Sequence, residues 1–308
     1  MKIPKRLLEA DTYMKPSIRM APFYGKLIYE KSNDKYKQKE VIETLSSRLF
    51  KKDLKGLITS NARESISLIL EKIVNNNKYL ICIITPSSSG YVSSCVTDTI
   101  KKKCKYTINY TPNADAYFFI HEFGRHVNIS EYNIDDSKII IEDCAYALVD
   151  KTSRYNIGKY SNYVIFSLSK AFGIQYGGLL FHDMNKSIGR SFLQPLELDY
   201  LISYLKSNIR NIKKNNYKRN DVYNALYKSF KKHKIYDAYR PKKYETPHAF
   251  FVNLESKKYD KSMKAYLNSV GIESSFFYGG NAYFLPCHHL MTQYEVEYIT
   301  HHVNKVIL

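Results

Sequence analysis

The sequence has no long uninterrupted hydrophobic run. None of its apolar stretches reaches the roughly 18 residues that a membrane-spanning helix requires. The first residues, MKIPKRLLEADTYMK, also lack the apolar centre of a secretory signal. A C-x-x-C pair is missing too, and the 5 cysteines lie mostly among apolar neighbours, as reduced core thiols of cytosolic proteins do. We therefore expect a cytoplasmic protein without a membrane partner.

Acidic residues are scarce relative to basic ones. The chain has 29 Asp and Glu against 47 Lys and Arg, a net charge of +18. A positive field of this size attracts nucleic acids, anionic membranes or phosphorylated small molecules. Lysine, asparagine and the 29 tyrosines are spread along the whole chain, however, which indicates a compositional drift with solvated lysines on every face. Because no recognised DNA or RNA module appears, we expect no nucleic-acid partner.

The 308 residues contain no internal repeat and no low-complexity linker. Apolar residues make up 44% and occur throughout, which excludes a disordered protein. From about residue 55, short apolar runs alternate with helical patterns, as in a mostly parallel sheet covered by helices. Near residue 183 the composition changes, and a long basic helical stretch runs from Lys206 to Lys234. We predict an α/β large domain over 1–205 and a small α+β domain over 206–308.

Local patterns place the elements within these domains. Apolar residues at helical spacing predict helices over 61–74 and 91–102 in the large domain, and over 261–271 and 291–307 in the small one. A capping box of Thr292 and Glu295 opens the last helix. Short apolar runs predict strands over 79–85, 106–110, 116–124, 138–148, 162–169, 249–255 and 272–278. Several of these runs become abruptly polar at their carboxyl ends, where open α/β sheets form their sites.

The segment HEFGRH begins with His121 at the end of one such run. A zinc-protease motif would place its two histidines four residues apart on one helical face. Here His121 and His126 are five residues apart, about 140° around a helix, and a strand precedes them. We therefore predict no metal site and expect His121 to border a pocket.

Two further strand ends carry ionisable groups. Asp143 ends the run IIIED, where it either caps a following helix or meets a cationic partner such as a protonated ring nitrogen. Lys170 lies in SLSKAFGIQYGGLLF, between serines that can bind an anion and glycines that allow tight turns. A surface lysine on a loop is the alternative. An Asp followed 27 residues later by Ser-x-x-Lys and Gly-Gly is what a pyridoxal phosphate (PLP) site requires, with Lys170 forming the Schiff base.

The order of these motifs resembles the DegT/DnrJ/StrS family of sugar aminotransferases, which have the fold-type-I architecture of PLP-dependent transferases. The likeness runs from about residue 56 to the end of the chain. The segments that carry it are GLITSNARESISLIL, YLICIITPSSSGYVSSCV, AYFFIHEFGRHVNI, IIIEDCAYAL, IGKYSNYVIFSLSKAFGIQYGGLLF, VGIESSFFY and FLPCHHLMTQYEVEYITHHV.

The resemblance implies a role for each matching residue. Lys170 would tether the cofactor and move protons, and Asp143 would pair with the pyridine nitrogen. The other implied contacts are Ser167 and the amides of Ala62 and Arg63 to the phosphate, Ala145 and Tyr91 to the two faces of the ring, Tyr146 to the ring hydroxyl, and His121 to the substrate pocket. The implied reaction transfers an amino group from glutamate to a nucleotide-linked keto-sugar, in a homodimer.

The chain departs from the family pattern at several places. Ala62 and Arg63 replace a Gly-Thr pair in the phosphate loop, and Tyr146 replaces a glutamine. The segment from Met184 to Tyr200 is contracted and lacks the Asn-Tyr-Arg contact that the family makes to the neighbouring subunit. Two alternatives therefore stay open: another PLP-dependent reaction on a nucleotide sugar, or a non-catalytic relative that binds the cofactor or an anionic partner.

Overall fold

The computed structural model describes residues 18–22, 38–76, 78–149, 155–185, 187–231, 239–254 and 261–307. The chain divides into two compact units, which we describe separately. One unit is Gly25–Lys213, and the other combines Met1–Tyr24 with Lys214–Leu308. In the described part of the chain, no helix is both long enough and apolar enough to cross a membrane.

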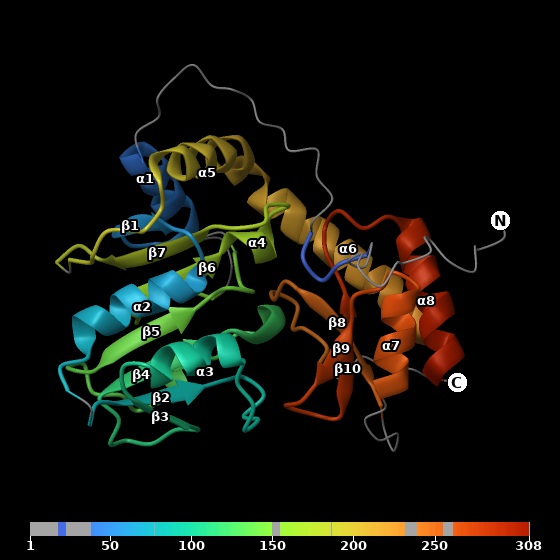
Figure 1. Ribbon diagram of the computed structural model, residues 1–308, viewed down its shortest axis with the longest axis horizontal. Helices are drawn as coiled ribbons and strands as arrows, with labels where there is room; N and C mark the ends of the chain where they lie inside the picture. The colour runs from blue at the N-terminus through green and yellow to red at the C-terminus, as the bar shows by residue number, and fades with distance from the viewer. Residues whose placement is uncertain are drawn as a thin grey trace. The chain divides into compact units, whose positions relative to one another are not determined.

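The Gly25–Lys213 unit is built on a seven-stranded sheet in the order β1-β7-β6-β5-β4-β2-β3 (Figure 1). Its strands are β1 (Leu54–Thr59), β2 (Leu80–Ile84), β3 (Lys105–Ile108), β4 (Ala116–Ile120), β5 (Ile139–Asp143), β6 (Tyr163–Ser167) and β7 (Gly178–Asp183). The five strands from β2 to β6 are mutually parallel, whereas β7 runs antiparallel to both β6 and β1. The predicted α/β fold with a mostly parallel sheet is confirmed.

Helices cover both faces of this sheet. On one face lie α2 (Ala62–Ile73) and α3 (Ser94–Lys101), and on the other lie α1 (Gln38–Leu49) and α5 (Pro195–Asn208). The short helix α4 (Leu168–Ala171) follows β6 directly, and the 3₁₀ turns η1 (Glu122–Gly124), η2 (Ile129–Glu131) and η3 (Ile209–Asn211) complete the unit. The sequence pattern anticipated α2 and α3, because their apolar residues repeat at helical spacing.

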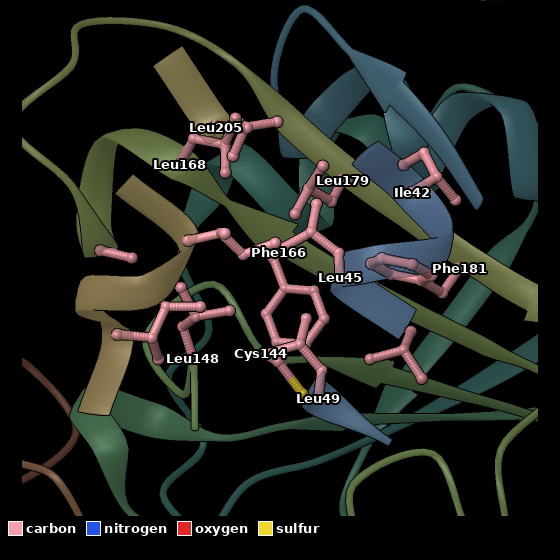
Figure 2. Packing of buried hydrophobic residues seen from close by; sticks show 14 of the residues in the cluster. Ile42, Leu45, Leu49, Cys144, Leu148, Phe166, Leu168, Leu179, Phe181 and Leu205 are labelled. Atoms are coloured by element: carbon pink, nitrogen blue, oxygen red, sulfur yellow. The ribbon is translucent and has the colours of Figure 1, made fainter. Parts of the chain in front are cut away.

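Successive side chains of a strand point to opposite faces of the sheet, so they contribute in turn to the apolar cores on the two faces. Val164 and Phe166 of β6 join the layer of α1 and α5, whereas Tyr163 and Ile165 join the layer of α2 and α3. Figure 2 shows the first layer, in which Phe166 lies among leucines from several elements and close to Cys144. Because strands β2, β4, β5 and β6 are largely buried on both faces, they read as continuous apolar runs in the sequence, whereas the edge strand β3 does not.

The strand register brings the predicted site segments to one edge of the sheet. Thr59 of β1 and Ser167 of β6 both pair with Gly178 of β7, so these three residues form a row across the strands. In the next strands, Asp143 of β5 pairs with Ile120 of β4 and with Ile165 of β6. The carboxyl ends of β1, β4, β5 and β6 therefore lie together at this edge.

The other unit contains a three-stranded antiparallel sheet in the order β8-β10-β9. Its strands are β8 (Ala249–Asn253), β9 (Ser275–Phe277) and β10 (Ala282–Pro286), and its helices are α6 (Ile212–Lys231), α7 (Lys261–Ser269) and α8 (Gln293–Ile307). Ile18 forms an isolated parallel bridge with Ile272, which ties the described N-terminal residues to this unit.

The sequence anticipated most of this unit. The capping box of α8 forms as predicted, since the Thr292 amide donates to Glu295 Oε2 at 2.7 Å and the Glu295 amide donates to Thr292 Oγ1 at 3.3 Å. The predicted basic helical stretch is divided between the end of α5, η3 and α6, and its last residues, 232–234, lie outside the described residues.

Gly178 permits a close approach of backbone within the Gly25–Lys213 unit. A Cβ atom there would lie 2.6 Å from Thr59 Oγ1 and 2.7 Å from the carbonyl carbon of Asn61. We expect Gly178→Ala to lower the free energy of unfolding by roughly 1–3 kcal/mol, because the obstacle includes backbone that cannot move without shifting α2. Urea denaturation measures this change.

Gly90→Ala is the matched control, because no atom lies within 4 Å of a Cβ at that position. We expect its effect to stay within about 0.5 kcal/mol. Equal losses in the two variants would contradict the close approach at Gly178.

Candidate active site

Lys170 lies in α4, immediately beyond the carboxyl end of β6. Its side chain is half-buried, and its Nζ atom lies 5.1 Å from the centre of the Tyr146 ring. A cation over an aromatic face at this distance is stabilised by the ring. The lysine is therefore sheltered and held at the sheet edge rather than free on a surface loop.

Asp143 is a buried carboxylate at the end of β5. Its Oδ1 atom accepts a hydrogen bond of 2.9 Å from the Ala145 amide, and it forms no ion pair with any described residue. Burial raises the pKa of Asp143, while the Ala145 amide and nearby His121 act in the opposite direction. No helix begins at Asp143, so the helix-cap interpretation does not describe it. A buried anion of this kind is stabilised by a cationic ligand.

The start of α2 offers a site for an anion. Asn61 caps the helix, since its side chain accepts from the Glu64 amide at 3.1 Å. The amides of Ala62 and Arg63 donate to no acceptor within the described part of the chain. Free amides and the positive end of the helix dipole favour a phosphate at such a position. The Arg63 side chain is exposed.

The glycine pair joins this helix start to the strand that precedes Lys170. The Gly177 amide donates to the Ser60 carbonyl at 2.7 Å, and Gly178 touches Asn61. Ser167 pairs with Gly178 on the other side of β7, so it lies at the same sheet edge as the turn before α2. Ser167 Oγ and Ser169 Oγ are 3.2 Å apart and share a hydrogen bond.

Aromatic side chains lie beside Lys170. The ring of Tyr146 packs on that of Phe123, with centroids 5.0 Å apart. Phe123 has a φ of 50°, a left-handed conformation that is rare for an aromatic residue. Ala145 is half-buried between Asp143 and Tyr146 in the chain. Tyr91 is 40% exposed in the loop after β2.

His121 lies on the opposite face of the sheet from Asp143. His121 follows β4 two residues after Phe119, and alternate residues of an extended chain point to the same face of a sheet. Phe119 packs with Cys82 and Tyr117 in an apolar cluster on that face. His121 is only 2% exposed. Its Nδ1 atom accepts from the Val127 amide at 3.2 Å, so its Nε2 atom donates to Glu142 Oε2 at 3.1 Å. This arrangement favours a structural role, and the substrate-pocket assignment of His121 stays a prediction.

Three potential metal ligands lie together around His121. The ligand atoms of His121, Glu142 and Cys144 lie within 4.8 Å of one another. Glu142 Oε1 also accepts from the Gly158 amide at 3.0 Å, and burial together with the carboxylates Glu142 and Asp143 raises the pKa of the Cys144 thiol well above its ordinary value. The His–Glu pair is therefore satisfied by hydrogen bonds, and the thiol is held in its protonated form.

Three residues of the site region escaped the sequence analysis. Glu142 was treated only as the neighbour of Asp143, and nothing in the local sequence predicts its pairing with His121. The strained Phe123 likewise has no sequence signal beyond the glycine that follows it. Glu64 could have been found, because Ser60 and Glu64 flank the Asn61 cap at the spacing of a capping arrangement.

A lysine beyond a strand end, a buried carboxylate and a free helix N-terminus at one edge of an α/β sheet are the groups that a PLP site of fold type I needs. A family model described as "Putative PLP-dependent aminotransferase" matches residues 42–237, more than half of the chain. The chain belongs to this family and is a PLP-dependent aminotransferase. A comparison with curated proteins finds no match.

Solved structures with the same fold include several sugar enzymes. The PLP form of the "Putative sugar aminotransferase Spr1654" from Streptococcus pneumoniae has a TM-score of 0.70 at 14% identity, over 96% of this chain and 98% of that one. A DegT DnrJ EryC1 StrS aminotransferase from Brucella abortus gives 0.60 at 11% identity, over 81% and 85%. A mutant of GDP-4-keto-6-deoxymannose-3-dehydratase (ColD) with bound GDP-perosamine gives 0.63 at 13% identity, over 80% and 88%. The predicted resemblance to this group of aminotransferases is confirmed.

The carboxylate of Asp143 supplies the first test of the site. We expect Asp143→Asn to weaken PLP binding and to lower turnover at least about 10²-fold, roughly 2.7 kcal/mol, because the pyridine nitrogen loses the anion that keeps it protonated. Cofactor titration and steady-state kinetics measure the two effects.

Asp136→Asn provides the control, since Asp136 is exposed in the loop before β5 and should leave both quantities unchanged. If Asp143→Asn bound and turned over like the parent enzyme, Asp143 would have no role at the cofactor.

Proposed function

We propose that the chain transfers an amino group from glutamate to a keto-sugar attached to a nucleotide. The observation that carries the proposal is the convergence of Lys170, Asp143 and the free amides of Ala62 and Arg63 at one sheet edge. The likeness to a structure with bound GDP-perosamine and to a sugar aminotransferase supports a nucleotide sugar as the acceptor class. The net charge of +18 suits a pyrophosphate-bearing substrate.

The residues would divide the work as follows. Bound PLP supplies an electron sink and carries the amino group between donor and acceptor. The amides of Ala62 and Arg63 and the Ser167 hydroxyl would hold the phosphate, while Asp143 would hold a proton on the ring nitrogen. Lys170 Nζ would tether the cofactor and then move a proton to and from the reacting carbon, as acid and base in both half-reactions.

Tyr146 and the remaining ring contacts complete the proposed site. Tyr146 lies beside Lys170, where its hydroxyl would replace the amide of the family's glutamine toward the ring hydroxyl. Ala145 and Tyr91 would contact the two faces of the ring. We also propose a cytoplasmic location, consistent with cysteines that are all free in the structure.

The catalytic assignment is tested with Lys170→Ala. We expect the parent enzyme with PLP and glutamate to release the donor's keto acid, and to aminate an added nucleotide-linked keto-sugar. Lys170→Ala should lose the visible absorbance of the lysine-bound cofactor and all turnover, because no other residue in the order of PLP motifs can supply the amine. Absorbance spectra and product mass measure the outcome.

Lys159→Ala is the matched control, because Lys159 also lies over a tyrosine ring, at 4.5 Å from the centre of Tyr160, but is exposed. It should behave like the parent enzyme. A Lys170→Ala variant that kept its rate within a few-fold would contradict the assignment. A parent enzyme that bound PLP without any turnover would favour the non-catalytic alternative.

We further propose a homodimer with its interface around the carboxyl edge of the sheet. Phe192 and Leu196 are 70% and 77% exposed at the start of α5, and large apolar side chains of this kind often mark interfaces. Light scattering at micromolar concentration should give a dimer for the parent enzyme and a monomer for Leu196→Asp. An aspartate suits the first turn of α5, so the variant should fold.

Tyr217→Asp is the control for this experiment, since Tyr217 is 61% exposed but lies on α6 of the other unit. It should leave the dimer intact. An active parent monomer would overturn the proposed assembly.

A further inference from the structure

The segment that follows β7 runs back along α2 toward the start of that helix. Three contacts at successive positions define its path. They are Lys72 Nζ donating to Ser187 Oγ at 3.3 Å, Leu68 against Gly189, where an added Cβ would lie 3.2 Å from the leucine, and the Phe192 amide donating to Glu64 Oε1 at 2.6 Å. The contracted segment, residues 187–193, thus lies along α2 and reaches the proposed phosphate site at the start of that helix.

Glu64 is the centre of this contact. While its Oε1 atom binds the Phe192 amide, its Oε2 atom accepts from the Ser60 amide at 2.6 Å. The residue is 7% exposed. Burial alone would raise the pKa of Glu64, but hydrogen bonds from Ser60, Phe192 and Ser191 outweigh it and lower the pKa below its ordinary value. The carboxylate is therefore ionised at neutral pH, and its hydrogen bonds are the strong charge-assisted kind.

The position of Glu64 links two parts of the site. Ser60 and Glu64 enclose Ala62 and Arg63, whose free amides face the proposed phosphate. A carboxylate that holds the Ser60 amide with one oxygen and the Phe192 amide with the other fixes this turn and the 187–193 segment to each other. Any anion that orders the turn will then order the segment as well, and the reverse must hold equally.

We propose that Glu64 is a positioning residue that couples the 187–193 segment to anion binding at the start of α2. The proposal rests on the proposed function only in taking the natural anion to be the phosphate of PLP. Free phosphate has the same chemistry and serves as the second probe.

The chemistry of the side chain suggests a selective variant. A glutamine at position 64 has one oxygen, so it can accept from only one of the two amides, and its NH₂ group would face the other N–H. Glu64→Gln therefore loses at least one charge-assisted bond, which is worth about tenfold in a local opening equilibrium. Glu71→Gln is the matched control, because Glu71 lies on the same helix in an exposed ion pair with Lys103 at 3.7 Å.

Hydrogen exchange of the full-length protein, read by mass spectrometry with and without saturating ligand, tests the coupling. In the parent enzyme and Glu71→Gln, PLP and inorganic phosphate should each slow exchange in peptides spanning 187–193. In Glu64→Gln, exchange of the Phe192 amide without ligand should be at least about tenfold faster, and the ligand-induced protection of the segment should be lost. Because protection is compared at saturation, an altered affinity does not change the result.

The outcomes separate the coupling from the proposed function. If phosphate but not PLP protected the segment in the parent enzyme, the coupling through Glu64 would stand, and the assignment of PLP to this site would be rejected. Binding of PLP with equal protection in Glu64→Gln and the parent enzyme would overturn the coupling and leave the cofactor in place. Binding of neither probe would overturn the coupling. If Glu64→Gln does not fold, Ser191→Ala removes a single donor to the carboxylate and should give a smaller loss of protection in the same direction.

Discussion

The close approach at Gly178 is the contact on which the candidate site depends. Two strands, β1 and β6, pair with β7 at this residue, and the backbone of Asn61 lies where a side chain would be. The absence of a Cβ lets the turn before α2 lie against the strand that leads to Lys170. The start of α2 and the strand that leads to Lys170, more than a hundred residues apart in sequence, meet for this reason. The antiparallel strand β7 thus separates β1 from β6 and sets the distance between the two segments.

Buried charge organises the two faces of the sheet differently. On the face of α2, Asp143 is buried and forms no ion pair with a described residue, so it carries an electrostatic cost that a cationic ligand would remove. On the opposite face, Glu142 and His121 satisfy each other with hydrogen bonds to neighbouring amides. Two adjacent acidic residues therefore have different surroundings: both oxygens of Glu142 accept hydrogen bonds within the protein, whereas Asp143 accepts one from the Ala145 amide. The alternation of side chains along β5 separates them.

Much of the fold could be predicted from local sequence. Strands buried on both faces read as apolar runs, and α2 and α8 carry helical spacing with caps. The candidate residues Lys170 and Asp143 were found because each ends an apolar run, and parallel strands place such ends at one edge. The order and direction of the strands could not be read in this way. Nothing local states that β7 runs antiparallel to its neighbours β1 and β6, because strand pairing depends on contacts between distant segments.

The sequence by itself determined many of the elements, the family and the candidate site residues, since these depend on residue type, periodicity and motif order. Only the tertiary structure decided which of these residues meet. It placed His121 against Glu142, packed the Tyr146 ring at a tilt against the left-handed Phe123, and joined the contracted segment to α2 through Glu64. The local sequence around each of these residues does not predict its contact partner. Their geometry is set by strand register and by the packing of the segments between them, which exist only in the folded chain.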